Sequence, residues 1–344
     1  MKKIKVLIVD DSEVIRQLLT EIISSAEDLE VVATAEDPFD AREKIKQFNP
    51  DVLTLDIEMP KMDGITFLRN IMRLRPMPVI MISTFTQEGV PATLEALSIG
   101  AVDYVSKPQI NSSDTLRNYT TEIQDKIRNA AKANLVAYEK SLENKSDKLQ
   151  QHTYDSRKII ALGGSTGGTE AIRQVLQSMP VNCPPILLVQ HIPATFSSSF
   201  AKRLNDQCDI TVQEAKTGMR IKPGNAYLAP GDSHLEIKEL DGHLVTCLNN
   251  KGKVNGHMPS LDVLFHSIAQ HVGKYSVAAI LTGMGSDGAQ GIKRIFDSGG
   301  TTFAQDEDTS VVWGMPGSAI RLNAIQQILP IQKITRALLD ACIK

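Results

Sequence analysis

The chain has 344 residues, 42% of them hydrophobic and 22% charged, with a formal net charge of −3, so we expect two globular domains and no nucleic-acid partner. No apolar stretch approaches the ~20 residues that a membrane-spanning helix needs, and the apolar run after Met1 is too short for a signal peptide. The four cysteines are scattered, without the spacing of a disulfide framework or a zinc site, which favours a cytoplasmic protein.

The first 125 residues alternate apolar strands with amphipathic helices. The apolar run 4–9 predicts a buried strand, and the spacing of apolar residues over 14–23 predicts a helix after it. The alternation continues with strands expected at 30–35, 51–55, 79–83 and 101–105 and helices at 38–48, 64–74 and 91–99. This order predicts a flavodoxin-like domain, a five-stranded parallel sheet with helices on both faces.

Polar residues follow several of these strands, at the edge of the sheet where ligands bind. They are Asp10 and Asp11 after the first strand, Asp56 after the third, Ser83 after the fourth and Lys107 after the fifth. Converging carboxylates repel one another unless a hard divalent cation binds them, and Mg²⁺ is the usual one. A carboxylate beside Mg²⁺ and a lysine can accept a phosphoryl group. The alternative, that Asp10 and Asp11 only cap the first helix, does not explain the whole set.

Three motifs of this region resemble the receiver domain of two-component response regulators, and the resemblance covers residues 1–125. The motifs are Val9-Asp10-Asp11-Ser12, Leu55-Asp56-Ile57-Glu58-Met59-Pro60-Lys61-Met62-Asp63-Gly64 and Val105-Ser106-Lys107-Pro108. The resemblance implies that a partner histidine kinase phosphorylates Asp56. It also implies an Mg²⁺ site whose ligands are Asp10, Asp11, Asp56 and the backbone carbonyl of Glu58.

The same resemblance implies residues that respond to phosphorylation. Lys107 would contact the phosphoryl group, and Ser83 would be the switch hydroxyl, with the neighbouring Thr84 as a second candidate. Tyr104 matches the switch aromatic residue of the family. Its alternative is an ordinary half-buried strand residue.

A polar segment of mixed charge follows the receiver-like region. A helical pattern over 111–137 leads into residues 139–157, which have too few large apolar side chains to bury much surface. We therefore expect a receiver domain over 1–125, a helical-to-flexible linker over 126–156 and a second domain over 157–344.

The second domain opens with a buried strand at 159–162 and the turn Gly163-Gly164-Ser165-Thr166-Gly167-Gly168, with Thr166 or Thr169 expected to cap the next helix. Such a turn can bind phosphate or expose a nucleophile. Ser165 interrupts the dinucleotide pattern G-x-G-x-x-G, the lysine of a P-loop is absent, and no acidic residue follows the next strand, 186–189. The remaining G-x-S-x-G pattern is typical of a nucleophile elbow. A response regulator with a nucleotide-binding or other non-hydrolytic output domain is the alternative function.

Two residues are expected at the same sheet edge as Ser165. His191 follows the strand 186–189, and Asp287 lies in a glycine-rich loop after the strand 276–281. Ser165 would be the nucleophile, His191 the general base, and Asp287 the residue that orients the imidazole. Taken singly, the three residues could be a helix cap, a strand-end residue and a turn residue. The order Ser, His, Asp differs from that of α/β-hydrolases, so that fold is not assumed.

Four motifs of the second domain resemble the protein-glutamate methylesterase family of bacterial chemotaxis, which also deamidates glutamine. The motifs lie at 163–168, 189–193, 281–288 and 305–316. The resemblance implies a γ-glutamyl methyl ester on chemoreceptors as substrate, a chemotaxis histidine kinase as phosphodonor, and contact with membranes only through the receptors. It also implies a role for Thr166 beside the nucleophile, the backbone N–H of Met284 in the oxyanion hole, and no cofactor in this domain.

The rest of the second domain predicts a mostly parallel, doubly wound α/β fold. The segments 219–235 and 244–248 predict β-hairpins that extend one edge of the sheet in antiparallel fashion. Residues 257–262 resemble a substrate-side loop of the family, and the alternative is a proline-containing turn with a helix cap. An amphipathic pattern over 334–343 predicts a final helix that packs on the sheet.

Overall fold

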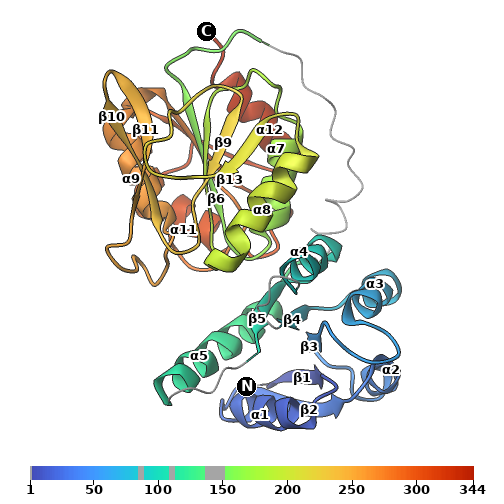
Figure 1. Cartoon of the computed structure of the whole chain (residues 1–344). Coiled ribbons are helices and arrows are strands. Elements are labelled where there is room, and N and C mark those ends of the chain that lie inside the picture. The colour runs from blue at the N-terminus through green and yellow to red at the C-terminus, as the bar shows by residue number, and fades with distance from the viewer. Residues whose placement is uncertain (1, 84–88, 108–112, 136–151) are drawn as a thin grey trace. The chain divides into compact units, whose positions relative to one another are not determined.

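The protein forms two compact units, Met1–Leu135 and Val136–Lys344 (Figure 1). The computed structural model describes residues 2–83, 89–107, 113–135 and 152–344. The expected boundary at residue 125 falls inside the helix α5 (Ser113–Ala130), and most of the expected linker lies outside the described residues. None of the helices in the described ranges is long and apolar enough to cross a membrane.

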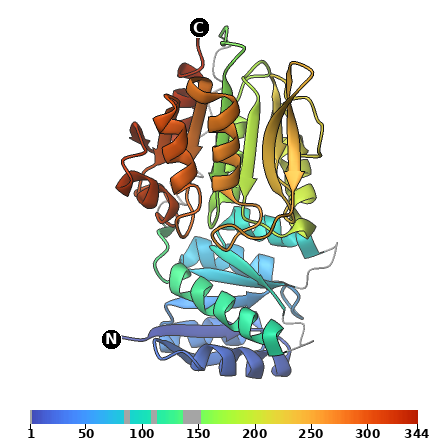
Figure 2. The same ribbon diagram turned by 90° about the vertical axis from the view of Figure 1, so that its left-hand side faces the viewer.

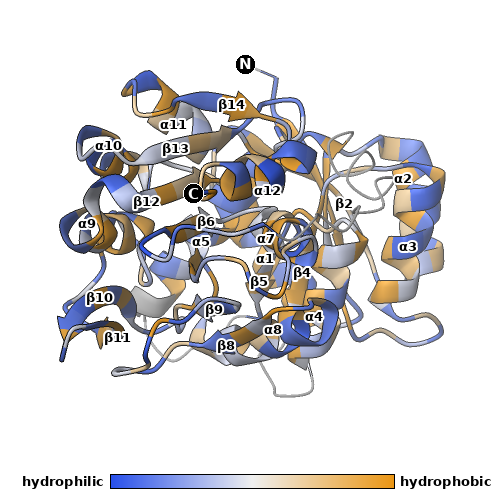
Figure 3. Ribbon diagram, turned by 90° about the horizontal axis from the view of Figure 1, so that it is seen from above, coloured by the Kyte–Doolittle hydropathy of each residue, from blue (hydrophilic) through white to orange (hydrophobic). Residues whose placement is uncertain are grey.

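The first unit is a five-stranded parallel sheet in the order β2-β1-β3-β4-β5. This is the predicted flavodoxin-like order, with α1 and α5 on one face and α2, α3 and α4 on the other. Around α2 and α3, hydrophobic residues alternate with hydrophilic ones (Figure 3), as helices with one buried face require. The remaining bounds are β1 (Ile4–Val9), α1 (Glu13–Ser24), β2 (Leu29–Ala35), α2 (Pro38–Phe48), β3 (Val52–Asp56), α3 (Gly64–Leu74), β4 (Val79–Ser83), α4 (Gly89–Ile99) and β5 (Asp103–Ser106).

The second unit contains a seven-stranded sheet in the order β14-β13-β12-β6-β7-β9-β8, in which every neighbouring pair is parallel. Helices α7, α8 and α12 cover one face, and α9, α10 and α11 cover the other. Figure 2 views the unit from the side of α9. The strands are β6 (Ile159–Gly164), β7 (Ile186–Gln190), β8 (Thr211–Glu214), β9 (Asn225–Leu228), β12 (Ser276–Ile280), β13 (Thr301–Gln305) and β14 (Gln327–Leu329). The helices are α7 (Gly168–Gln177), α8 (Ala194–Gln207), α9 (Leu261–His271), α10 (Ala289–Asp297), α11 (Met315–Arg321) and α12 (Ile331–Asp340).

An antiparallel hairpin is present, but it spans residues 234–249 and does not extend the edge of the main sheet. Most of the predicted segment 219–235 lies outside it, and β9, within that segment, pairs in parallel with β7 and β8. β10 (His234–Leu240) and β11 (His243–Asn249) form a separate two-stranded sheet. Leu235 and Ile237 of β10 are buried in the core that α9 shares, and the Ile237 N–H donates to Ser267 Oγ at 2.8 Å. The expected place of the hairpin is therefore wrong, because β10 buries its apolar side against a helix.

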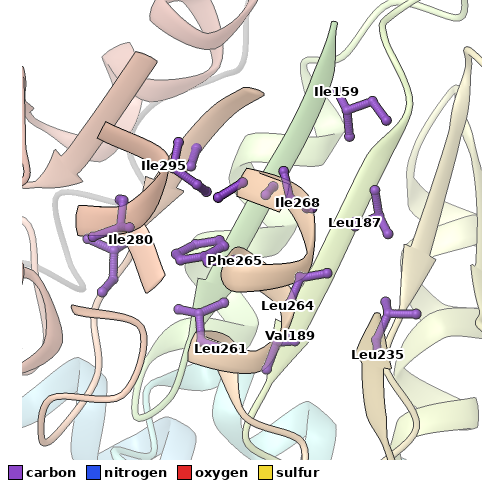
Figure 4. Close-up of a cluster of buried hydrophobic side chains, with 14 of the residues drawn as sticks. Ile159, Leu187, Val189, Leu235, Leu261, Leu264, Phe265, Ile268, Ile280 and Ile295 are labelled. Carbon is purple, nitrogen blue, oxygen red and sulfur yellow. The ribbon is translucent and has the colours of Figure 1, made fainter. Parts of the chain in front are cut away.

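A hydrophobic core fixes α9 against the central strands (Figure 4). The side chains of Leu261, Leu264 and Phe265 are fully buried and point toward β6 and β7. The contact is close enough that a Cβ built on Gly163 would lie 2.1 Å from Leu261 Cδ1. An added Cβ would have to shift the buried Leu261 side chain, so the end of β6 and the N-terminus of α9 are closely packed here.

Candidate active site and phosphoacceptor site

The first residue of the active-site group, Ser165, directly follows the central strand β6. Gly164 of β6 pairs with Gln190 of β7, so Ser165 and His191 follow paired residues on strands that lie about 4.8 Å apart. The Ser165 N–H donates to the carbonyl of Thr282 at 3.0 Å, and the Ser165 carbonyl accepts from Gln190 Nε2 at 2.8 Å. One backbone hydrogen bond to Thr282 and one from the Gln190 side chain therefore hold the serine in place.

The helix after Ser165 begins in a different way from the predicted one. Gly167 is the N-cap residue of α7, and no side chain caps this end, so the expected cap by Thr166 or Thr169 is wrong. Gly167 has φ +77°, a left-handed conformation that favours glycine, and a Cβ there would lie 2.7 Å from Val311 Cβ. The sharp turn thus depends on the left-handed conformation of Gly167, and no threonine hydroxyl caps the helix.

His191 and Asp287 form a buried pair, as the sequence predicted. His191 Nε2 lies 2.8 Å from Asp287 Oδ2, and the His191 side chain is only 9% exposed. The other ring nitrogen, Nδ1, is buried and has no hydrogen-bond partner among the described residues. With Nε2–H donating to the carboxylate, Nδ1 is the nitrogen left to accept a proton.

The N-terminus of α9 holds the Asp287 carboxylate. Ser260 Oγ donates to Asp287 Oδ1 at 2.7 Å, and the Leu261 N–H donates to Asp287 Oδ2 at 2.7 Å. Burial raises the pKa of Asp287, but the hydrogen bond and charge of His191, with those donors, hold the pKa well below its usual range. The carboxylate is therefore ionised and able to stabilise a protonated imidazole.

Sequence analysis did not predict the residues that support Asp287. Ser260 is the N-cap residue of α9, yet its hydroxyl does not cap the helix and contacts Asp287. Asn255 Nδ2 donates to Asp262 Oδ2 at 2.6 Å and to Asp287 Oδ1 at 3.3 Å. The resemblance had singled out residues 257–262 for the substrate side. Several of their observed contacts are with the His191–Asp287 pair, through the ring of His257, the hydroxyl of Ser260 and the N–H of Leu261.

The loop after β12 approaches Ser165 closely. Thr282 Oγ1 donates to the carbonyl of Thr166 at 3.0 Å, and a Cβ built on Gly283 would lie 2.9 Å from Ser165 Cβ. Met284, the next residue, is 38% exposed. The two residues predicted to surround the nucleophile, Thr166 and Met284, thus belong to segments in contact with it, and their roles in an oxyanion hole remain predictions.

In the first unit the three predicted carboxylates come together. Oxygen atoms of Asp10, Asp11 and Asp56 all lie within 4.8 Å of one another; Asp10 and Asp56 are buried and Asp11 is exposed. Asp10 Oδ2 has no hydrogen-bond partner in the described part of the chain. A set of hard oxygen donors, one of them buried and engaged only in an ion pair with Lys107 at 3.4 Å, fits a divalent cation.

Lys107 completes this acidic cluster. Its Nζ lies 2.7 Å from Asp56 Oδ2 and 3.4 Å from Asp10 Oδ2. Burial raises the pKa of Asp56 to about 6, assisted by the charge of Asp10 and opposed by Lys107. The Glu58 N–H contacts Asp56 Oδ1 at 3.4 Å, while the predicted role of the Glu58 carbonyl stays a prediction.

The predicted switch residues are both buried. Ser83 Oγ accepts from Thr93 Oγ1 at 3.1 Å, and the Ser83 carbonyl accepts from the Lys107 N–H at 2.8 Å. Tyr104 is 6% exposed, more buried than the half-buried strand residue of the alternative interpretation, and Lys126 Nζ lies 4.9 Å from its ring centre. Thr84 lies outside the described residues.

A receiver-type sheet with an acidic phosphoacceptor cluster, joined to a parallel α/β unit with serine, histidine and aspartate at one edge, defines a response regulator with a hydrolase-type output domain. The family model described as CheB methylesterase matches residues 160–338, and the one described as response regulator receiver domain matches residues 6–119. The chain therefore belongs to the CheB methylesterase family and carries a receiver domain. The alternative of a nucleotide-binding output domain is not supported.

Relatives match over the full length. A protein of Saccharophagus degradans, named protein-glutamate methylesterase/protein-glutamine glutaminase 2, is 50% identical over 348 residues and covers 100% of both chains. A Salmonella typhimurium protein with the same two activities in its name is 48% identical over 339 residues, covering 98% of this chain and 97% of its own. The crystal structure of the CheB methylesterase catalytic domain of Thermotoga maritima has a TM-score of 0.52 and 39% identity, and the match covers 53% of this chain and 97% of that chain.

Proposed function

We propose that this protein hydrolyses γ-glutamyl methyl esters on chemoreceptors, releasing methanol, and deamidates selected glutamines on the same receptors. The observation that carries the proposal is the buried His191–Asp287 pair at 2.8 Å beside the turn that holds Ser165. Relatives named for these two activities match the whole chain at about half identity. The catalytic domain uses no cofactor in this proposal.

Each residue of the trio has one role in the proposed reaction. Ser165 Oγ attacks the side-chain carbonyl carbon as its proton passes to His191 Nδ1. The imidazolium then protonates the leaving group, which departs as methanol from the ester or as ammonia from the amide. Water hydrolyses the acyl-enzyme by the reverse proton transfers, which regenerates Ser165 and leaves glutamate. Asp287 holds the imidazole through Nε2 and stabilises its positive charge.

The negative charge on the carbonyl oxygen needs donors near Ser165. We assign this role to the backbone N–H of Met284, with Thr166 beside the nucleophile. The close approach of Gly283 to Ser165 supports this assignment, because it brings the loop that bears Met284 next to the reacting serine.

The receiver unit is proposed to regulate the hydrolase. A chemotaxis histidine kinase would phosphorylate Asp56, with Lys107 contacting the phosphoryl group and Ser83 and Tyr104 responding to it. Mg²⁺ would be held by Asp10, Asp11, Asp56 and the Glu58 carbonyl, and it would neutralise the charge of the phosphoryl group during transfer. The protein would act in the cytoplasm and meet membranes only through its receptor substrates.

Methanol release tests the proposed activity. Receptor-containing membranes carrying radiolabelled methyl esters are incubated with the wild-type chain, with Ser165→Ala and with the matched control Ser198→Ala, an exposed serine of α8. The wild type and the control should release methanol, and Ser165→Ala should release none above background. If the wild type releases no methanol, the proposed activity is wrong. If Ser165→Ala releases as much methanol as the wild type, the assignment of Ser165 as the nucleophile is wrong.

A further inference from the structure

A second histidine lies flat against the catalytic histidine. The ring centres of His191 and His257 are 3.9 Å apart, and the angle between the ring planes is 10°. His257 is partly buried, and the proposed mechanism gives it no role. The contact is between rings on segments far apart in the sequence, so the fold has to bring His257 to this place.

A tight turn holds His257 there. The Val254 N–H donates to the His257 carbonyl at 3.0 Å, and the His257 N–H donates to the Val254 carbonyl at 2.9 Å. The two residues between them, Asn255 and Gly256, have φ of 53° and 82°, as in a type I′ turn. Asn255 contacts Asp287, so one four-residue turn touches both members of the His191–Asp287 pair.

We infer that His257 is a positioning residue for the proposed hydrolysis, whose ring covers one face of His191 and keeps the imidazole in the orientation that pairs Nε2 with Asp287. The inference rests on the proposed function. His191 has a single hydrogen bond from its ring, at Nε2, within the described residues. One bond leaves the ring free to tilt about that contact, and a parallel ring at stacking distance removes this freedom.

The charge state of His257 suits this role. The charged or titratable groups that act on it are His191, Asp287 and Lys253. Burial, with the neighbouring His191, lowers the pKa of His257 to about 4, so the ring is neutral at neutral pH. A neutral aromatic face attracts the cation that His191 becomes during the reaction, whereas a second imidazolium would repel it.

The test compares three substitutions of His257 in the full chain. His257→Phe keeps a flat aromatic face, His257→Leu keeps volume without that face, and His257→Ala removes both. The control is His271→Ala, because His271 is the exposed last residue of α9. The readouts are kcat and KM for methanol release and the rate at which a fluorophosphonate probe labels Ser165, which reports how well His191 activates the serine.

We expect His257→Ala and His257→Leu to lower kcat and the labelling rate by about tenfold or more with KM unchanged, because a general base contributes 100-fold or more only when correctly oriented. His257→Phe should retain most of both rates, and His271→Ala all of them. Wild-type rates in His257→Leu would overturn the inference, as would equal losses in His257→Phe and His257→Leu. If His257→Ala fails to fold, the comparison of phenylalanine with leucine decides. A wild-type chain that neither releases methanol nor is labelled at Ser165 contradicts the proposed function instead.

Discussion

At the scale of single residues, the contacts around Asp287 stabilise its ionised carboxylate. Asp287→Asn keeps the size of the side chain but removes the charge and offers an amide that can hold the wrong tautomer of His191. We expect kcat for ester hydrolysis to fall by roughly a hundredfold to ten-thousandfold, in line with the same change in other triads. Asp206→Asn, at an exposed position of α8, should leave kcat unchanged. An Asp287→Asn protein with wild-type kcat would contradict the assignment of Asp287.

His257 should also affect the pH dependence of stability. Its pKa is lowered from 6.5 to about 4 by burial and by His191, so between these values the unfolded chain binds a proton that the folded protein resists. The free energy of unfolding therefore falls as pH drops through this window, and it does so less without the histidine. Calorimetric unfolding at about pH 7 and about pH 5 should show a smaller loss of Tm for His257→Phe than for the wild type. Equal losses in the two proteins would show that His257 is not the group that titrates.

At the scale of secondary-structure elements, the packing of α9 on β6 connects the core to the active site. A Cβ on Gly163 would lie 2.1 Å from Leu261 Cδ1, and Leu261 is fully buried, so Gly163→Ala must shift the Leu261 side chain at the start of α9. We expect a loss of about 2 kcal/mol or more in the free energy of unfolding, measured in urea. Gly218→Ala is the comparison, since nothing lies within 4 Å of its Cβ and only its φ of +87° is unfavourable.

A double mutant separates the clash from other effects of Gly163→Ala. Leu261→Ala removes the side chain that the new Cβ would meet but keeps the backbone N–H that donates to Asp287. The double mutant should be less destabilised than the sum of the two single mutants, by about 1–2 kcal/mol. Strict additivity would mean that the two positions are not coupled.

At the scale of the whole molecule, each unit has its own sheet and its own core, so residues 152–344 should fold alone and hydrolyse esters. Acetyl phosphate with Mg²⁺ should change the rate of the full chain and not that of the fragment, because Asp56, the proposed phosphoacceptor, lies in the first unit. We expect the unphosphorylated full chain to hydrolyse esters more slowly than the fragment, because we expect the unphosphorylated receiver unit to inhibit the second unit. A fragment no faster than the unphosphorylated chain would contradict this inhibition, and an Asp56→Asn chain that still responds would contradict Asp56 as the acceptor.

The order of elements and the residues at the strand ends could be predicted from local sequence patterns. The five-stranded and the seven-stranded sheet are parallel and covered by helices on two faces, so their strands are short apolar runs that end at polar residues. Asp56, Ser165 and His191 could be predicted for this reason, because each terminates or directly follows such a run. The start of α7 could not be predicted in this way. The threonines nearby suggested a side-chain cap, but the helix begins after Gly167, which has a left-handed conformation.

The support of the His191–Asp287 pair depends on packing between distant segments and could not be predicted from local patterns. The N–H of Leu261 and the hydroxyl of Ser260 reach Asp287 because α9 packs on β6, and the turn before α9 lays His257 on His191. Local patterns record which residues prefer a helix, a strand or a turn. They do not predict the contacts that form when two elements far apart in the sequence pack together in a core. The polar residues at the strand ends could therefore be predicted from local patterns, whereas the residues that hold the His191–Asp287 pair follow from packing alone.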